Sequence, residues 1–93
     1  MNFKSILEAY NANPTEENRK KVMFASCKRK GCVDIFRKKE IADRVSFKYT
    51  LDEQVDIVLS GDAEEITALK EYREDVKAEV DAYIQQLESE VEI

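Results

Sequence analysis

The sequence contains no histidine, only two glycines and only one proline. Without histidine, the chain lacks the usual general base, the usual neutral metal ligand and the usual group that titrates near neutral pH. It also contains no glycine-rich phosphate loop, no nucleophile elbow and no carboxylate pair on an apolar wall. We therefore expect a protein that is not an enzyme, with no catalytic residues and no cofactor.

The scarcity of glycine and proline also bears on the fold. With 43% hydrophobic and 38% charged residues, the composition favours helices with short connections over a turn-rich β architecture. A chain of 93 residues is long enough for one modest hydrophobic core. The sequence therefore predicts a single, mainly all-α domain over residues 1–93.

The chain has two cysteines, Cys27 and Cys32. A closed structural zinc site needs four ligands, so this pair predicts no metal site. Two thiols are ordinary in a reducing compartment, and we expect both to be reduced and structural, with a redox pair as the alternative. No segment approaches the roughly 20 apolar residues of a membrane span, and no signal sequence is visible. We expect a soluble protein that stays inside the cell.

The clearest pattern is a long amphipathic helix from Asp62 to Leu87. Asp62 and Glu65 form a capping box at its start, and Gly61 can end the preceding helix. At 100° per residue, its apolar side chains fall within an arc of about 120°. The stripe consists of Ile66, Leu69, Tyr72, Val76, Val80, Tyr83, Ile84, Leu87 and Val91.

The length of this helix predicts an interaction surface. It spans about 39 Å, whereas a compact chain of this size has a radius of gyration of roughly 12–13 Å, so one end should overhang. An overhanging apolar stripe needs cover from a second copy or from another protein. Glutamates at its C-terminal end oppose the helix dipole, so we expect fraying there unless a partner supplies cations. The predicted interaction residues are Leu69, Tyr72, Arg73, Val76, Val80, Tyr83 and Leu87.

Shorter helices are predicted ahead of the long one. The first covers 2–11 and ends at a proline-containing loop. The second begins at the capping residue Thr15, ends at Gly31, and has acids in its first turn and bases in its last. Residues 32–45 approximate one helical face and predict a third helix, although 32–36 also fits a short strand.

The middle of the chain is ambiguous. An alternation of apolar and polar residues predicts an extended segment near 45–49, before a helix that Thr50 and Glu53 cap and Gly61 ends. A small hairpin at 45–60, which would make the fold α+β, is the alternative. The alternating apolar residues are Val45, Phe47, Tyr49 and Leu51.

Charge is divided unevenly along the chain. Residues 1–48 hold twelve Lys and Arg against six acids, a net charge of +6, whereas residues 49–93 hold three against fourteen, a net charge of −11. Basic triplets in the first half could contact phosphates, but we expect them to face the acidic half of the same protein instead. Nucleic-acid binding by segment 19–39 is the less favoured alternative. The possible polyanion contacts are Lys20, Lys21, Lys28, Arg29, Lys30, Arg37, Lys38 and Lys39.

Three stretches of residues 45–88 form a recognisable series: Val45–Val55, Gly61–Glu65 and Tyr72-Arg73 within the final helix. In these stretches the chain resembles small proteins encoded by tailed bacteriophages. Such proteins share an aromatic and basic segment, a Tyr-Ser/Thr-Leu-Asp helix start and a final helix with an acidic run that contains tyrosine. The resemblance implies a viral protein located in the host bacterial cytoplasm or the virion. It carries over no functional residues.

Together these observations predict a non-enzymatic protein–protein interaction protein. We expect it to be a phage virion-associated or assembly component that acts through its long C-terminal helix, on a protein partner or as a homo-oligomer. The alternatives are an inhibitor used in host takeover and a nucleic-acid-associated protein that uses the basic segment.

Overall fold

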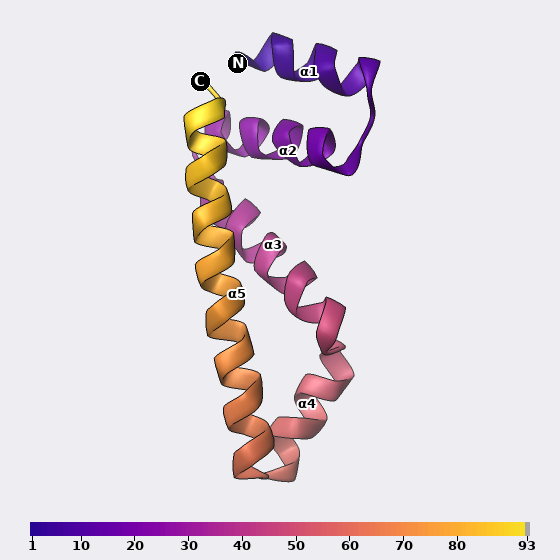
Figure 1. The fold of residues 1–93 in the computed structure, drawn as a ribbon, viewed down its shortest axis with the longest axis vertical. Helices are drawn as coiled ribbons and strands as arrows, with labels where there is room; N and C mark the ends of the chain where they lie inside the picture. Colours follow the sequence, from indigo (N-terminus) through magenta and orange to yellow (C-terminus); the bar gives the residue numbers. More distant parts are fainter. Residues whose placement is uncertain (93) are drawn as a thin grey trace.

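The computed structural model describes residues 1–92 and contains five helices joined by short connections (Figure 1). No strand occurs within these residues, so the all-α prediction is confirmed and the hairpin alternative is wrong. None of the described helices is both long and apolar enough to cross a membrane. The helices are α1 (Phe3–Ala12), α2 (Glu16–Lys30), α3 (Val33–Lys48), α4 (Leu51–Ser60) and α5 (Ala63–Glu90).

Local capping chemistry defines the helix ends as predicted. The side chains of Thr15, Thr50 and Asp62 accept hydrogen bonds from backbone N–H groups in the first turns of α2, α4 and α5. Gly31 and Gly61 end α2 and α4 in the left-handed conformation, with φ of 72° and 70°. These φ values are the reason that glycine suits both positions.

The extended segment predicted near 45–49 is wrong, because α3 continues through Lys48. The N–H of Tyr49 still donates to the carbonyl of Val45 at 2.9 Å, and only Tyr49 and Thr50 have extended backbone angles. The alternating pattern misled because Phe47 is apolar but 95% exposed. Val45 is buried on the same helical face as Ile41, and this tertiary packing selects the helix. The helix predicted over 32–45 is confirmed as part of α3.

The molecule is elongated, with extents of 49 × 21 × 19 Å and a radius of gyration of 16.2 Å. Figure 1 shows α5 running along most of the long axis, with α1 and α2 near its C-terminal end and α3 crossing it obliquely. The helix α4 folds back beside the first turns of α5 at the opposite end, where α1, α2 and α3 do not reach. One end of α5 therefore extends beyond the core with α4 alone as its neighbour.

Two apolar clusters hold α5 to the rest of the chain. The half-buried Ile84 packs against both clusters and joins them. The apolar stripe is thus covered by the other helices of the same chain along most of its length. The cluster at the C-terminal end contains Ile6, Phe24, Ala25, Phe36, Leu87 and Val91, and the central cluster contains Ile41, Val45, Val76 and Val80.

The same substitution at two valines tests this arrangement. Val76→Asp places a carboxylate at a position that is 3% exposed and should lower the free energy of unfolding by about 3 kcal/mol or more. Val58→Asp, at a position of α4 that is 61% exposed, should change it by less than about 0.5 kcal/mol. Urea denaturation followed by circular dichroism measures both. Equal stability of the two variants would contradict the placement of α5.

Candidate interaction surfaces

The helix α4 turns an apolar face toward solvent. Its four large aliphatic side chains at positions 51, 55, 58 and 59 are 48 to 78% exposed, and no residue of α4 is buried. Their spacing of i, i+4, i+7 and i+8 places them on one side of the helix. Contiguous exposed apolar side chains of this kind are typical of an interaction site. We call this surface the α4 ridge; it consists of Leu51, Val55, Val58 and Leu59.

Polar contacts, together with one half-buried isoleucine, hold α4 against α5. The guanidinium of Arg73 on α5 donates to Oε1 of Gln54 at 2.9 Å, and the amide of Gln54 donates to the carbonyl of Tyr49 at 3.1 Å. Gln54 and Ile57 are the half-buried residues of α4, so they mark the side of the helix that is directed inward. Arg73, predicted from the sequence as an interaction residue, therefore orients α4. Gln54 also borders a shallow apolar groove of about 260 Å³ that Val55, Val58 and Leu59 complete.

Negative charge surrounds the α4 ridge. Residues 49–69 contain six carboxylates and neither lysine nor arginine. Because nothing in this segment neutralises them, they create a negative potential around the exposed apolar side chains. We call this end of the molecule, residues 50–66, the acidic tip. Its carboxylates belong to Asp52, Glu53, Asp56, Asp62, Glu64 and Glu65.

The stripe residues predicted to mediate interaction lie largely inside the chain. Leu69, Val76, Val80 and Leu87 are buried, and Tyr72, Arg73 and Tyr83 are half-buried. The hydroxyl of Tyr72 donates to the carbonyl of Arg44 at 3.3 Å, and the ring of Tyr83 lies 6.5 Å from that of Phe36. These contacts are with α3 of the same chain, so the stripe forms part of the chain's own hydrophobic core.

A second exposed apolar group stands at the end of α3. The ring of Phe47 borders an open groove of about 460 Å³, which Tyr72 and Val76 of α5 and four charged residues also line. Two of the predicted interaction residues, Tyr72 and Val76, therefore line this groove. Its charged lining residues are Lys20, Asp43, Arg44 and Glu79.

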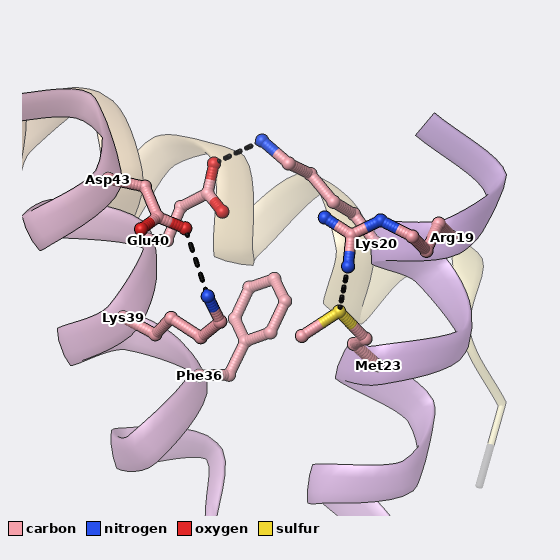
Figure 2. Close-up of a pocket in the computed structure, with 7 residues that line it drawn as sticks. All are labelled: Arg19, Lys20, Met23, Phe36, Lys39, Glu40 and Asp43. Carbon is pink, nitrogen blue, oxygen red and sulfur yellow. Dashed lines mark hydrogen bonds and ion pairs between the residues drawn. The ribbon is translucent and has the colours of Figure 1, made fainter. Parts of the chain in front are cut away.

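A buried carboxylate links three helices. Glu40 on α3 is 4% exposed, and its Oε1 accepts hydrogen bonds from Nζ of Lys20 on α2 at 2.7 Å and from Nε of Arg44 at 3.1 Å. Figure 2 shows Lys20 reaching across from α2 to this carboxylate. Arg44 also approaches Glu79 on α5, at 3.8 Å. A buried charge needs such partners, because desolvation without them is costly.

Sequence reasoning did not identify Glu40, although a signal was present. Glu40 lies four residues after Phe36 and four before Arg44, which places all three on one face of α3. The cavity beside the carboxylate measures about 10 Å³, which is room for about one water molecule. The cluster therefore joins helices and offers no space for a substrate.

Two substitutions measure how much this cluster stabilises the fold. Lys20→Met should lower the free energy of unfolding by about 1–3 kcal/mol, because it removes one of the two cations that compensate the buried carboxylate. Glu40→Gln should cost less than about 1 kcal/mol, since the amide oxygen can still accept a hydrogen bond and no charge remains buried. Thermal denaturation of both variants checks the order. A larger loss for Glu40→Gln would mean that the ion pair is net stabilising.

The basic triplets mostly face carboxylates of the same chain, but only some of these carboxylates belong to the acidic half, which the sequence predicted as their partner. Five of the eight possible polyanion contacts lie within 4 Å of an acid, and three of them reach α5. The guanidinium of Arg37, whose Nε lies 2.6 Å from Oδ1 of Asp81, holds the pKa of that carboxyl below its usual range through a hydrogen bond. The five pairs are Lys20–Glu40, Lys21–Glu90, Lys28–Glu88, Arg37–Asp81 and Lys39–Asp43.

The remaining three cations are at the surface. The guanidinium of Arg29 lies 4.4 Å from the ring centroid of Phe3, and Lys30 and Lys38 are exposed. These are fewer and more scattered than the contacts a phosphate backbone usually receives.

The acidic C-terminal end of α5 is stabilised by the same pairs. Lys28 and Lys21 approach Glu88 and Glu90, and the terminal amino group of Met1 donates to the carbonyl of Glu90 at 2.6 Å. The sequence predicts fraying here unless a partner supplies cations. The cations come from α2 and from the chain's own N-terminus, and α5 remains helical through Glu90.

The ion pairs lead to a prediction about nucleic acid. At about 0.15 M salt, where the Debye length is about 8 Å, we expect the chain to bind duplex DNA more weakly than micromolar. A variant with Asp81→Asn, Glu88→Gln and Glu90→Gln should bind more tightly, because it frees Arg37, Lys28 and Lys21. Fluorescence anisotropy with labelled DNA measures both. Micromolar binding by the unaltered chain, abolished by Arg29→Glu and Lys30→Glu, would contradict this prediction.

Comparisons with known proteins identify no site that could be transferred to this chain. No family model, no curated protein and no solved structure matches it. Within residues 1–92, no group of three or more potential ligands is placed to hold a metal ion.

Proposed function

We propose that this chain is a non-enzymatic protein–protein interaction protein that binds its partner through the α4 ridge. The observation that carries this proposal is the exposure of Leu51, Val58 and Leu59, each more than 60% exposed on a helix without a buried residue. Full burial of one valine or leucine side chain contributes about 1.5–3 kcal/mol. A partner that covers four such side chains gains a substantial part of its binding energy from them.

The partner that fits this surface is a cationic amphipathic helix of another protein. Its apolar side chains would pack on the shallow hollow beside Val55 and Val58, as one amphipathic helix packs against another. Its lysines and arginines would meet the six carboxylates of the acidic tip. A two-fold contact between copies would place acids against acids, and an anionic membrane or nucleic acid would be repelled in the same way.

The long helix α5 contributes to this function mainly by position. Its stripe packs on α2 and α3, while its first turns and Arg73 hold α4 at the far end of the molecule. The resemblance of residues 45–88 to tailed-phage proteins covers this same region. It supports a partner that is either a virion component during assembly or a host protein that the virus inhibits.

A designed peptide provides a direct test. The probe is a fluorescein-labelled amphipathic helix of leucine and lysine, titrated with the chain at about 0.15 M salt. We expect saturable one-to-one binding that Val58→Asp weakens at least about tenfold, a difference of about 1.4 kcal/mol. Thr67→Asp, at an exposed position on α5, should leave the affinity within about threefold. Both variants add one negative charge, so electrostatics alone would predict tighter binding for both.

Other outcomes would contradict the proposal. A scrambled peptide of the same composition should bind much more weakly; equal binding would mean that charge alone attracts the probe. Native mass spectrometry tests whether a second copy of the chain covers the α4 ridge. A dimer that Val58→Asp separates would show that this surface joins copies of the chain and does not receive a partner helix.

A further inference from the structure

The two cysteines lie on either side of the turn that ends α2. The N–H of Cys32 donates to the carbonyl of Cys27 at 2.9 Å, and the N–H of Gly31 donates to the carbonyl of Lys28 at 3.2 Å. Together with the left-handed angles of Gly31, φ 72° and ψ 28°, this is a Schellman motif. The residues in the positions of Cys27 and Cys32 usually bring two apolar side chains together. Here the motif brings two thiols together.

The thiols combine proximity with access. Both cysteines are free and half-buried, and Cys27 packs against the apolar cluster at the C-terminal end of α5. Burial raises the pKa of Cys27, and the neighbouring Cys32 thiol raises it further. Cys32 occupies the position before α3 without making a side-chain capping hydrogen bond, so changing its chemistry removes no cap.

The backbone geometry is compatible with a covalent bridge. The hydrogen bond from the backbone N of Cys32 to the carbonyl O of Cys27 is 2.9 Å long. Each of these two atoms lies at a fixed covalent distance from the Cα of its own residue, so the two Cα atoms are at most about 6.8 Å apart. Disulfides accept Cα separations of about 4.4–6.8 Å. The exposed side chains of Arg29 and Lys30 also give this turn a positive charge, which favours the approach of an anionic oxidant.

We propose that Cys27 and Cys32 form a site of reversible oxidation, at which an intramolecular disulfide closes across the cap of α2. The oxidant is a low-molecular-weight disulfide such as glutathione disulfide. One cysteine attacks it as the thiolate, forms a mixed disulfide and releases one glutathione; the second then displaces the other glutathione. Two protein thiols are oxidised, glutathione disulfide is reduced by two electrons to two glutathiones, and the two thiol protons end on these products.

Oxidation would fix the junction between α2 and α3. Gly31 is the one residue in this turn with a positive φ, and rotation there changes the direction in which α3 leaves α2. A bridge from Cys27 to Cys32 restrains that rotation. Because Cys27 packs on the cluster at the C-terminal end of α5, the bridge would also restrain the packing of the core at this end of the molecule.

The test uses the full folded chain, incubated with glutathione disulfide and quenched with acid before intact-mass analysis. We expect loss of both free thiols, a mass lower by two hydrogen atoms, no link between chains and complete reversal by dithiothreitol. The helical circular dichroism signal should be unchanged, and the melting temperature should rise. Cys32→Ser should instead retain one glutathione on Cys27.

Two glycine variants test whether disulfide closure depends on the geometry of the α2 cap or only on the short sequence separation of the two cysteines. Gly31→Ala strains the left-handed turn without a steric clash, since nothing lies within 4 Å of the added Cβ, and should slow closure several-fold. Gly61→Ala imposes the same strain at the end of α4 and should leave the rate of closure unchanged. The proposal is overturned if each cysteine retains its own glutathione, if oxidation links two chains, or if Gly31→Ala closes as fast as the unaltered chain.

Discussion

The packing of the α5 stripe against α2 and α3 is the interaction on which the rest of the structure depends. Val76 and Val80 meet α3 at the centre, and Leu87 meets α1 and α2 at the end. Since α5 runs along most of the long axis of the molecule and the core covers only part of this helix, its first turns extend beyond the core (Figure 1). α4 follows α3 in sequence and packs against these first turns, where no second helix covers it. The exposure of its apolar face is a consequence of this geometry.

Charge reinforces the same division of the molecule. The basic first half supplies Lys21, Lys28 and Arg37, which pair with acids in the C-terminal half of α5. These pairs are partly exposed, and each contributes little by itself. Their joint effect is to neutralise the C-terminal half of α5 while the acidic tip stays uncompensated. The acidic tip is therefore negatively charged and, along the α4 ridge, also apolar. This combination is the basis for proposing a cationic amphipathic partner.

The sequence predicts those features that local chemistry decides. Thr15, Thr50 and Asp62 are correct helix starts because a capping side chain acts on backbone groups within its own first turn. The alternating pattern mispredicts the end of α3 because two of its four apolar residues, Phe47 and Leu51, are exposed, so the alternation does not mark the buried face of a strand. The burial of Glu40 depends on Lys20, twenty residues away, and the exposure of the α4 ridge depends on where α3 ends. Local spacing places Glu40 on the same helical face as Phe36, but it specifies neither the cation on α2 nor the exposure of α4.

The most direct test of this account is hydrogen–deuterium exchange of the chain with and without the cationic amphipathic peptide. Amides of residues 76–87, in the part of α5 that packs on the core, should be well protected in both states. Binding should add protection in α4, residues 51–60, and in the adjoining first turns of α5. Added protection along 76–87, with α4 unchanged, would show that the stripe opens to receive the partner and would contradict the assignment of the α4 ridge as the interaction surface.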